Sequence, residues 1–231
     1  MLADPDITVV MAVRDGGRFI FDAIKSLSRQ SVSPAEIILV DDGSTDDSAR
    51  QAISAGEGLI RVIRQDPSGI AVARNRGIQA AGTEFIAIFD SDDLAPEGRF
   101  QSLRQPFFQD PDLQITAGRW LNFWDPSATA EADDPSVQHL KGEMSSMLLS
   151  VSLIRRQLFE TIGPFCEDND FIEGQLWLHA ATDRGVKTSR VDDVVLHRRI
   201  HDRNFSRKKS ADNMVDLLWL RMKGRQTSAV G

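Results

Sequence analysis

Short apolar runs recur along the first half of the chain, separated by segments whose apolar side chains follow helical spacing. The runs are rich in Val, Ile and Leu and lack the strict alternation of a half-exposed strand. Each run therefore predicts a strand that is buried on both faces. These strands are expected at residues 7–13, 37–40, 59–63 and 85–89.

Three helices are predicted between these strands. The first has apolar residues on one face, at Phe19, Ile20, Ala23, Ile24 and Leu27. Ser44 or Thr45 is expected to cap a second helix that begins at Asp46. A third helix is expected over 70–81 and to stop at Gly82. Strands that alternate with helices indicate βαβ units, and therefore an α/β fold with a mainly parallel sheet.

The second half of the chain is less regular. Helices are expected from Pro96 to about 108 and over 155–161, 172–184 and 211–223. Strands are expected over 115–124, 187–191 and 194–200. Residues 125–136 are rich in Asp, Ala, Ser and Pro and predict a loop or a mobile lid. No segment of the sequence has the composition of a linker, so a single domain is predicted.

Charge and composition narrow the classes of function. The net charge of −7 and the pI near 5.1 argue against a nucleic-acid-binding protein. The single cysteine, Cys166, excludes an internal disulfide and is expected to be buried or half-buried. The N-terminus lacks the basic start and apolar stretch of a signal peptide, and no run is long enough to span a membrane. A cytoplasmic protein is therefore expected.

Three carboxylates, Asp90, Asp92 and Asp93, directly follow the predicted strand 85–89. The carboxyl edge of a parallel sheet is where open α/β folds bind ligands. Carboxylates this close repel one another unless a cation lies between them, and oxygen ligands favour Mg²⁺ or Mn²⁺. A metal held there could carry a diphosphate. The alternative is an acidic, solvated turn.

Taken together, four segments resemble the family-2 glycosyltransferases of the GT-A fold. The segments are residues 9–27 with Gln30, the motif Ile-Leu-Val-Asp-Asp-Gly-Ser-Thr-Asp at 38–46, residues 69–82 with Asp90-Ser91-Asp92-Asp93, and residues 176–206 with Arg-x-His-x-x-Asn-x-Ser from Arg199. They occur in the family's order over nearly the whole chain. The resemblance implies a GT-A, Rossmann-like nucleotide-diphospho-sugar transferase with a mixed sheet. The sheet would be shared by a nucleotide-sugar-binding half (1–95) and an acceptor-binding half (96–210). Residues 211–231 would form a terminal helix and tail.

The resemblance also implies a metal-dependent, inverting transfer of a sugar from a nucleotide sugar, a UDP-sugar, to a hydroxyl. The acceptor would be a glycan or lipid-linked molecule of cell-surface or secreted glycan synthesis. Mn²⁺ or Mg²⁺ would be held by Asp92, Asp93 and His201. The donor would be bound by Ala12, Val13, Arg14, Asp15, Asp42, Gly69, Arg74, Asp90, Ser91 and Asp92. Among these, Asp42 matches the carboxylate that accepts the N–H of a uridine base.

An inverting transfer needs a base to accept the proton of the acceptor hydroxyl. Family members carry an aspartate three residues before the Leu-Trp-Leu segment, and this chain has Glu173 there. Asp170 and Asp168 are the alternatives if the alignment slips.

Two further positions depart from the family. Ala12-Val13-Arg14-Asp15 replaces a Pro-x-Tyr-Asn turn, which weakens the expectation of a uracil base, although the Arg14 guanidinium can stack on a base. His179 stands where family members often have arginine.

Two other functions remain open from the sequence. A sugar-phosphate nucleotidyltransferase shares the sheet and the metal carboxylates, but it usually has a glycine-rich basic loop where this chain has Arg14 to Arg18. A non-catalytic nucleotide-sugar-binding module is favoured only by the glutamate at 173.

The terminal helix over 211–223 is apolar on more than one face and has basic neighbours. It is expected to pack on the domain, to join two copies, or to lie on the inner face of a membrane.

Overall fold

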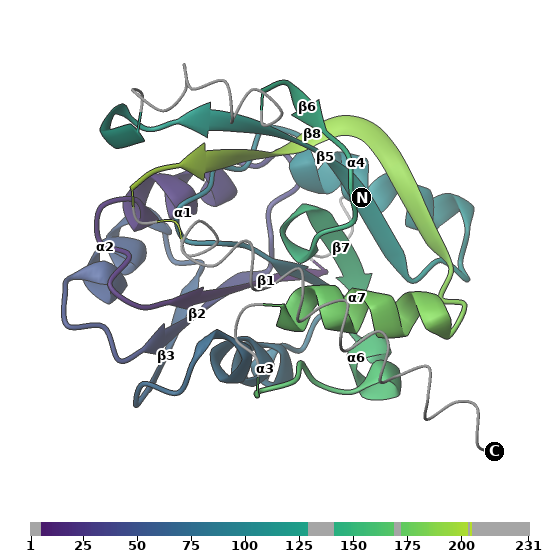
Figure 1. Cartoon of the computed structure of the whole chain (residues 1–231), viewed down its shortest axis with the longest axis horizontal. Coiled ribbons are helices and arrows are strands. Elements are labelled where there is room, and N and C mark those ends of the chain that lie inside the picture. The colour runs from purple at the N-terminus through teal and green to yellow at the C-terminus, as the bar shows by residue number, and fades with distance from the viewer. Residues whose placement is uncertain (1–5, 129–140, 169–171, 203, 205–231) are drawn as a thin grey trace.

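The computed structural model describes residues 6–128, 141–168, 172–202 and 204. Within this part of the chain, one eight-stranded sheet is flanked by helices (Figure 1). The strand order is β3-β2-β1-β4-β7-β5-β6, with β8 paired to β5 off this path. The prediction of an α/β fold with a mixed, mainly parallel sheet is confirmed.

The N-terminal half supplies four parallel strands and three helices. The strands are β1 (Ile7–Val13), β2 (Glu36–Asp42), β3 (Ile60–Gln65) and β4 (Phe85–Ile88). The helices are α1 (Ile20–Ser28), α2 (Ser48–Ala55) and α3 (Ile70–Ala80). Because β1 pairs in parallel with both β2 and β4, the loops that follow these three strands leave the same edge of the sheet.

The C-terminal half completes the sheet with strands of both directions. Its strands are β5 (Ile115–Trp124), β6 (Glu143–Met144), β7 (Ser152–Arg155) and β8 (Thr188–Ile200). Its helices are α4 (Arg99–Gln109), α6 (Gln157–Ile162) and α7 (Glu173–Asp183), with short 3₁₀ turns η1 (Pro126–Ala128) and η3 (Leu149–Val151). Strand β7 runs antiparallel to both β4 and β5 and joins the two halves.

The core lies on both faces of the sheet. Val9 and Met11 of β1 belong to the apolar cluster that includes residues of α1, α2 and α4, whereas Val10 belongs to the second cluster, with residues of α3 and α7. All three side chains are fully buried. Burial on both faces explains why these strands read as continuous apolar runs rather than alternating ones.

Three expectations about local structure are wrong. Helix α2 begins at Ser48, and the hydroxyls of Ser44 and Thr45 instead hydrogen-bond Asp15 across the loops. The helix after Pro96 begins at Arg99. Cys166 is exposed, because the preceding Phe165 takes the buried position in this loop.

Two strands of the C-terminal half also differ from the prediction. Residues 187–191 and 194–200 form one strand, β8, whose pairing with β5 shifts register around Arg119. The sequence break at Asp192 and Asp193, both exposed, corresponds to this irregularity. Strand β7 was not anticipated, since its last residue, Arg155, was expected to begin a helix.

Several predicted features lie outside the described residues. These are the helix over 211–223, most of the 125–136 loop, and Asp170. Among the helices that the structure describes, none combines the length and apolar character needed to cross a membrane. A single domain remains a prediction, consistent with the sheet that both halves share.

Candidate active site

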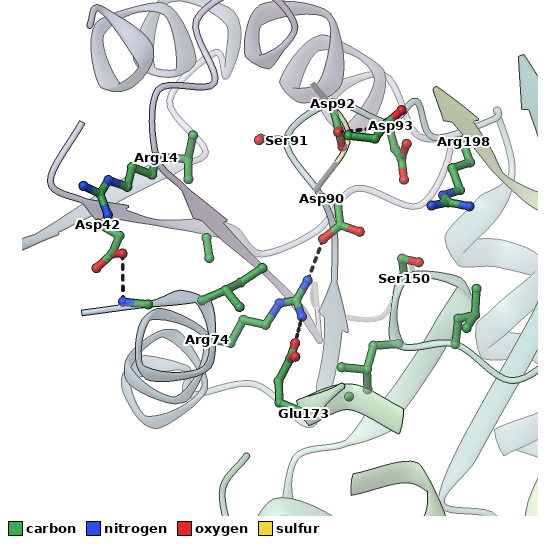
Figure 2. Close-up of a pocket in the computed structure, with 18 of the residues that line it drawn as sticks. Arg14, Asp42, Arg74, Asp90, Ser91, Asp92, Asp93, Ser150, Glu173 and Arg198 are labelled. Atoms are coloured by element: carbon green, nitrogen blue, oxygen red, sulfur yellow. Dashed lines mark hydrogen bonds and ion pairs between the residues drawn. The ribbon is translucent and has the colours of Figure 1, made fainter. Parts of the chain in front are cut away.

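A pocket of about 720 Å³ lies at the carboxyl edge of β1, β2 and β4 and extends to the start of α7. All ten residues expected to bind the donor line it, as do Asp93 and Glu173 (Figure 2). His201 is not among the residues that line the pocket, but its ring contacts the pocket residue Asp92. The loops after three parallel strands and the N-terminus of α7 thus converge on one cavity.

Arg14 and Asp42 lie at one end of the pocket (Figure 2). The Asp42 carboxylate accepts hydrogen bonds from Gln65 Nε2 at 2.8 Å, Ser68 N at 2.7 Å and Gly69 N at 3.0 Å. Asp42 therefore fixes the loop between β3 and α3. Gly69 has φ of 98°, a backbone conformation that favours glycine and explains why this residue precedes the helix.

Asp15 joins the loops that follow β1 and β2. Its backbone N–H donates to Ser44 Oγ at 3.0 Å, and its Oδ1 accepts from Thr45 N at 2.8 Å. The φ of Asp15 is 53°, in the left-handed region, where aspartate is tolerated better than most residues. These bonds hold the strained residue in place and set the spacing of the two loops at the pocket rim.

Arg74 on α3 connects the Asp cluster to the start of α7. Its Nη2 lies 2.6 Å from Asp90 Oδ1, and its Nη1 hydrogen-bonds the Glu173 carboxylate. Glu173 is 3% exposed. Burial raises the pKa of Glu173 above its ordinary value, and the positive charge of Arg74 opposes this effect. A carboxylate in these surroundings holds a proton more readily than one in water.

Asp92 faces His201 at the far side of the cluster. Asp92 Oδ2 lies 2.9 Å from His201 Nε2 and accepts from Asn204 Nδ2 at 3.3 Å. The His201 ring is buried and packs against Phe19, with ring centroids 4.6 Å apart. Phe19, just before α1, therefore packs against the His201 ring, just after β8, while the ring faces the Asp92 carboxylate.

Asp93 is turned into the protein interior and is 3% exposed. Its Oδ1 accepts the backbone N–H of Arg199 at 2.9 Å. Burial, with the nearby charges of Asp92 and Asp90, raises the pKa of Asp93 well above its usual range. Burial lowers the pKa of the fully buried Arg99 to about 9, and the charges of Asp93 and Asp90 oppose this effect. The neighbouring carboxylates and burial thus disfavour the ionised form of Asp93, and a cation beside the cluster would favour it.

The donor set suits a divalent cation that is shared with a ligand. Asp92 and His201 offer an oxygen and an imidazole nitrogen side by side, a pairing that Mn²⁺ accepts. Among the described residues, no group of three or more such side chains converges as a closed metal site. Mg²⁺ and Mn²⁺ at phosphate-binding sites commonly take their remaining ligands from water and from the phosphates. The residues present therefore fit a metal that arrives with a diphosphate.

The opposite wall of the pocket was largely missed from the sequence. It is formed by η3 and its neighbours, by α7 and by β8, through Leu148, Leu149, Ser150, Gly174, Gln175, Leu178 and Arg198. No local pattern marks the segment 148–150 as part of a site. Arg198 lies within residues 176–206, the last of the four segments that resemble the family, but the resemblance assigns no role to this position. His179 and Asp168 are not among the residues that line this pocket.

Comparison with known proteins identifies a family. Residues 8–166 match the model described as Glycosyl transferase family 2, which is more than half of the chain. Glycosyltransferase GlyG of Streptococcus pneumoniae is 35% identical over 120 residues, which is 51% of this chain and 40% of that protein. The chain thus spans well under two thirds of that relative's length.

Two solved structures share the fold. S. aureus TarS 1–349 in complex with UDP-GlcNAc has a TM-score of 0.68 and 18% identity, with 86% of this chain and 59% of that chain covered. Glucosyl-3-phosphoglycerate synthase from Mycobacterium tuberculosis, in complex with Mn²⁺, UDP and phosphoglyceric acid, has a TM-score of 0.59 and 22% identity, with 86% and 72% covered. The architecture is therefore that of the GT-A glycosyltransferases.

Proposed function

Because the chain belongs to glycosyl transferase family 2, we propose that it moves a sugar from a UDP-sugar to an acceptor hydroxyl, with inversion, in cell-surface or secreted glycan synthesis. One observation carries the proposal. The residues expected to bind the donor line a single pocket together with a buried carboxylate, Glu173. The solved neighbours that bind UDP or UDP-GlcNAc support a uridine nucleotide.

In the proposed reaction, the acceptor oxygen forms a bond to the anomeric carbon while the bond from that carbon to the diphosphate oxygen breaks. The bonding pair leaves with the nucleoside diphosphate, and Glu173 accepts the proton of the hydroxyl. The raised pKa of Glu173 suits a group that must take up a proton near neutral pH. Arg74 would keep part of the Glu173 population ionised and would hold the carboxylate toward Asp90.

Asp42, Gly69 and Arg14 are proposed to bind the nucleoside. Asp42 already accepts two hydrogen bonds from the loop that ends at Gly69 and one from Gln65 at the end of β3, so it would shape the base site as well as contact it. Arg14 would present its planar guanidinium to the base. Asp15 would set the width of this end through its bonds to Ser44 and Thr45.

The proposed metal, Mn²⁺ or Mg²⁺, would be held by Asp92 and His201. Asp93 would act from the interior, since it is buried against Arg199. When bound, the metal would neutralise the charge that develops on the leaving diphosphate. The Mn²⁺ and UDP in one solved neighbour support this assignment.

Product analysis tests the proposed function. The protein is incubated with UDP-, GDP- and dTDP-sugars, Mn²⁺ and a mixture of glycan and lipid-linked acceptors, and both nucleoside diphosphate and pyrophosphate are measured. We expect release of UDP from a UDP-sugar that depends on an acceptor. A second incubation supplies UTP and a sugar phosphate, and pyrophosphate release there would instead identify a nucleotidyltransferase. Binding of UDP without turnover of any donor would identify a non-catalytic module.

A further inference from the structure

Arg198, near the end of β8, brings a positive charge to the end of the pocket that the nucleotide residues do not occupy. Among the residues that the structure describes, three guanidinium groups line the cavity, those of Arg14, Arg74 and Arg198. Figure 2 shows Arg14 beside Asp42 at one end and Arg198 at the other, near Asp93 and Ser150, with Asp90 and Arg74 between the two ends. The donor assignments account for the first end. At the second end they give a role to Asp93 and leave Arg198 and Ser150 without one.

The wall around Arg198 is rigidly supported. The guanidinium of the fully buried Arg99 donates to the carbonyl of Ser150 at 2.7 Å and to the carbonyl of Val195 at 2.6 Å. The next residue after Arg198, Arg199, donates its backbone N–H to Asp93 at 2.9 Å. Both η3 and the end of β8 are thus fixed to buried groups, so the half-buried Arg198 extends from a stable strand.

The arginines that line the pocket differ in the charged groups around them. The charge of Arg74 is shared between the carboxylates of Asp90 and Glu173. Arg198 lies farther along the pocket wall, near Ser150 and Asp93, and its charge acts on Asp93 rather than on that pair. A guanidinium offers paired N–H donors that match a phosphate or a carboxylate. A hydroxyl beside it adds a further donor, as Ser150 can.

We propose that Arg198, with Ser150 beside it, binds an anionic group of the acceptor, a phosphate or a carboxylate close to the hydroxyl that receives the sugar. This inference rests on the proposed function, and it names the acceptor as an anionic molecule. The leucines at 148, 149 and 178 would contact the uncharged part of the acceptor. Arg198 would then determine acceptor selectivity and would contribute little to donor binding.

Arg198 also acts on Asp93, whose pKa it lowers against the larger effect of burial. If Arg198 served only to favour the ionised form of Asp93, its replacement would have different consequences. Loss of the Arg198 charge would then weaken binding of UDP with Mn²⁺ and would not distinguish charged from neutral acceptors. The two roles are therefore separable by measuring donor and acceptor affinity in the same variants.

The test uses calorimetry on the full chain. UDP with Mn²⁺ is titrated first, and the loaded protein is then titrated with sn-glycerol 3-phosphate and with glycerol, and with glucuronate and with glucose. The variants are Arg198→Gln and the charge-retaining Arg198→Lys. Arg184→Gln, at the exposed end of α7, is the matched control. Circular dichroism melting confirms that each variant is folded.

We expect wild type to bind at least one charged probe about ten-fold or more tightly than its neutral partner, as for a charge-assisted hydrogen bond. Arg198→Gln should lose this preference, Arg198→Lys should keep part of it, and Arg184→Gln should keep all of it. UDP affinity should stay within about two-fold in each case. The phosphate and carboxylate pairs show which anion is preferred.

Normal UDP binding with no preference for either charged probe in wild type would overturn this inference alone. A preference that survives in Arg198→Gln would overturn it as well, as would a loss of UDP affinity without a change in the preference. Failure of wild type to bind UDP with Mn²⁺ would contradict the proposed function, and the inference would fall with it.

Discussion

Arg74 on α3 pairs with Glu173, the first residue of α7, across 99 residues of sequence. The same guanidinium lies 2.6 Å from Asp90, which follows β4. Both Arg74 and Glu173 are nearly buried. Arg74 therefore links Asp90, on the proposed donor side, to Glu173, the proposed base. A substitution at one of these carboxylates should alter the charge and position of the other.

Replacement of Arg74 by glutamine should move the pH dependence of turnover. Glu173 must be ionised to accept a proton, and its pKa is already raised by burial. Arg74 lowers that pKa, so its loss should raise the pKa further and shift the acid limb of kcat to higher pH. Arg74→Lys should shift it less. The measurement is kcat against pH at saturating donor. An unchanged acid limb would show that Glu173 is not the titrating base.

Glu173→Gln should reduce kcat by about 10²–10⁴-fold, since general base catalysis contributes on that order. UDP affinity should change far less, because the donor residues remain. Glu173→Asp should retain partial activity. Asp168→Asn, in the exposed turn before α7, is the matched control and should behave as wild type. Comparable activity in Glu173→Gln and wild type would mean that another group accepts the proton.

His201→Gln should weaken the dependence of UDP binding on Mn²⁺ about ten-fold or more, the scale of losing a group that binds or orients a metal ligand. Asp92→Asn should have a similar effect, and the double variant should be less than additive because the two side chains are 2.9 Å apart. UDP binding without Mn²⁺ should not change. His179→Gln, on α7 and away from the Asp cluster, is the control.

The Mn²⁺ effect in His201→Gln is interpreted by comparison with the effect in Asp92→Asn. If the variant keeps the full Mn²⁺ effect while Asp92→Asn loses it, the imidazole only packs between Phe19 and Asp92. Full retention in both variants would place the metal elsewhere.

Gly174→Ala should destabilise the protein by about 1–3 kcal/mol through overpacking. A Cβ at Gly174 would lie 2.5 Å from Leu149 Cδ1, and both residues are buried in the pocket wall. The added methyl should push the start of α7 away from η3 and displace Glu173, so kcat should fall more than UDP affinity. Urea denaturation and steady-state kinetics check this. The double variant Gly174→Ala/Leu149→Ala should recover kcat, because it removes the clash between the new Cβ and Leu149. Failure to recover kcat would contradict this steric explanation.

The sequence predicted the donor side of the site more completely than the acceptor side. Buried parallel strands end at one edge, so residues that follow 7–13, 37–40 and 85–89 had to meet there. Glu173 was found through the family motif rather than through periodicity. Its pairing with Arg74 could not be foreseen, because spacing along the chain does not report which helices face each other.

The parts that sequence reasoning missed have local physical reasons. Strand β7 has only four residues and ends in Arg155, which made it resemble the start of a helix. The hydroxyls of Ser44 and Thr45 satisfy Asp15 instead of capping α2, because the tertiary contact between two loops competes with the local cap. The wall at 148–150 has no distinctive pattern and is defined only by packing.

The most direct measurement is calorimetric titration of the wild-type protein with UDP, GDP and dTDP, each with and without Mn²⁺. The account predicts that UDP binds in preference to GDP and dTDP, and that its affinity rises when Mn²⁺ is present. No binding of any diphosphate to the folded protein would contradict the donor site. Equal binding with and without Mn²⁺ would contradict the role proposed for Asp92 and His201.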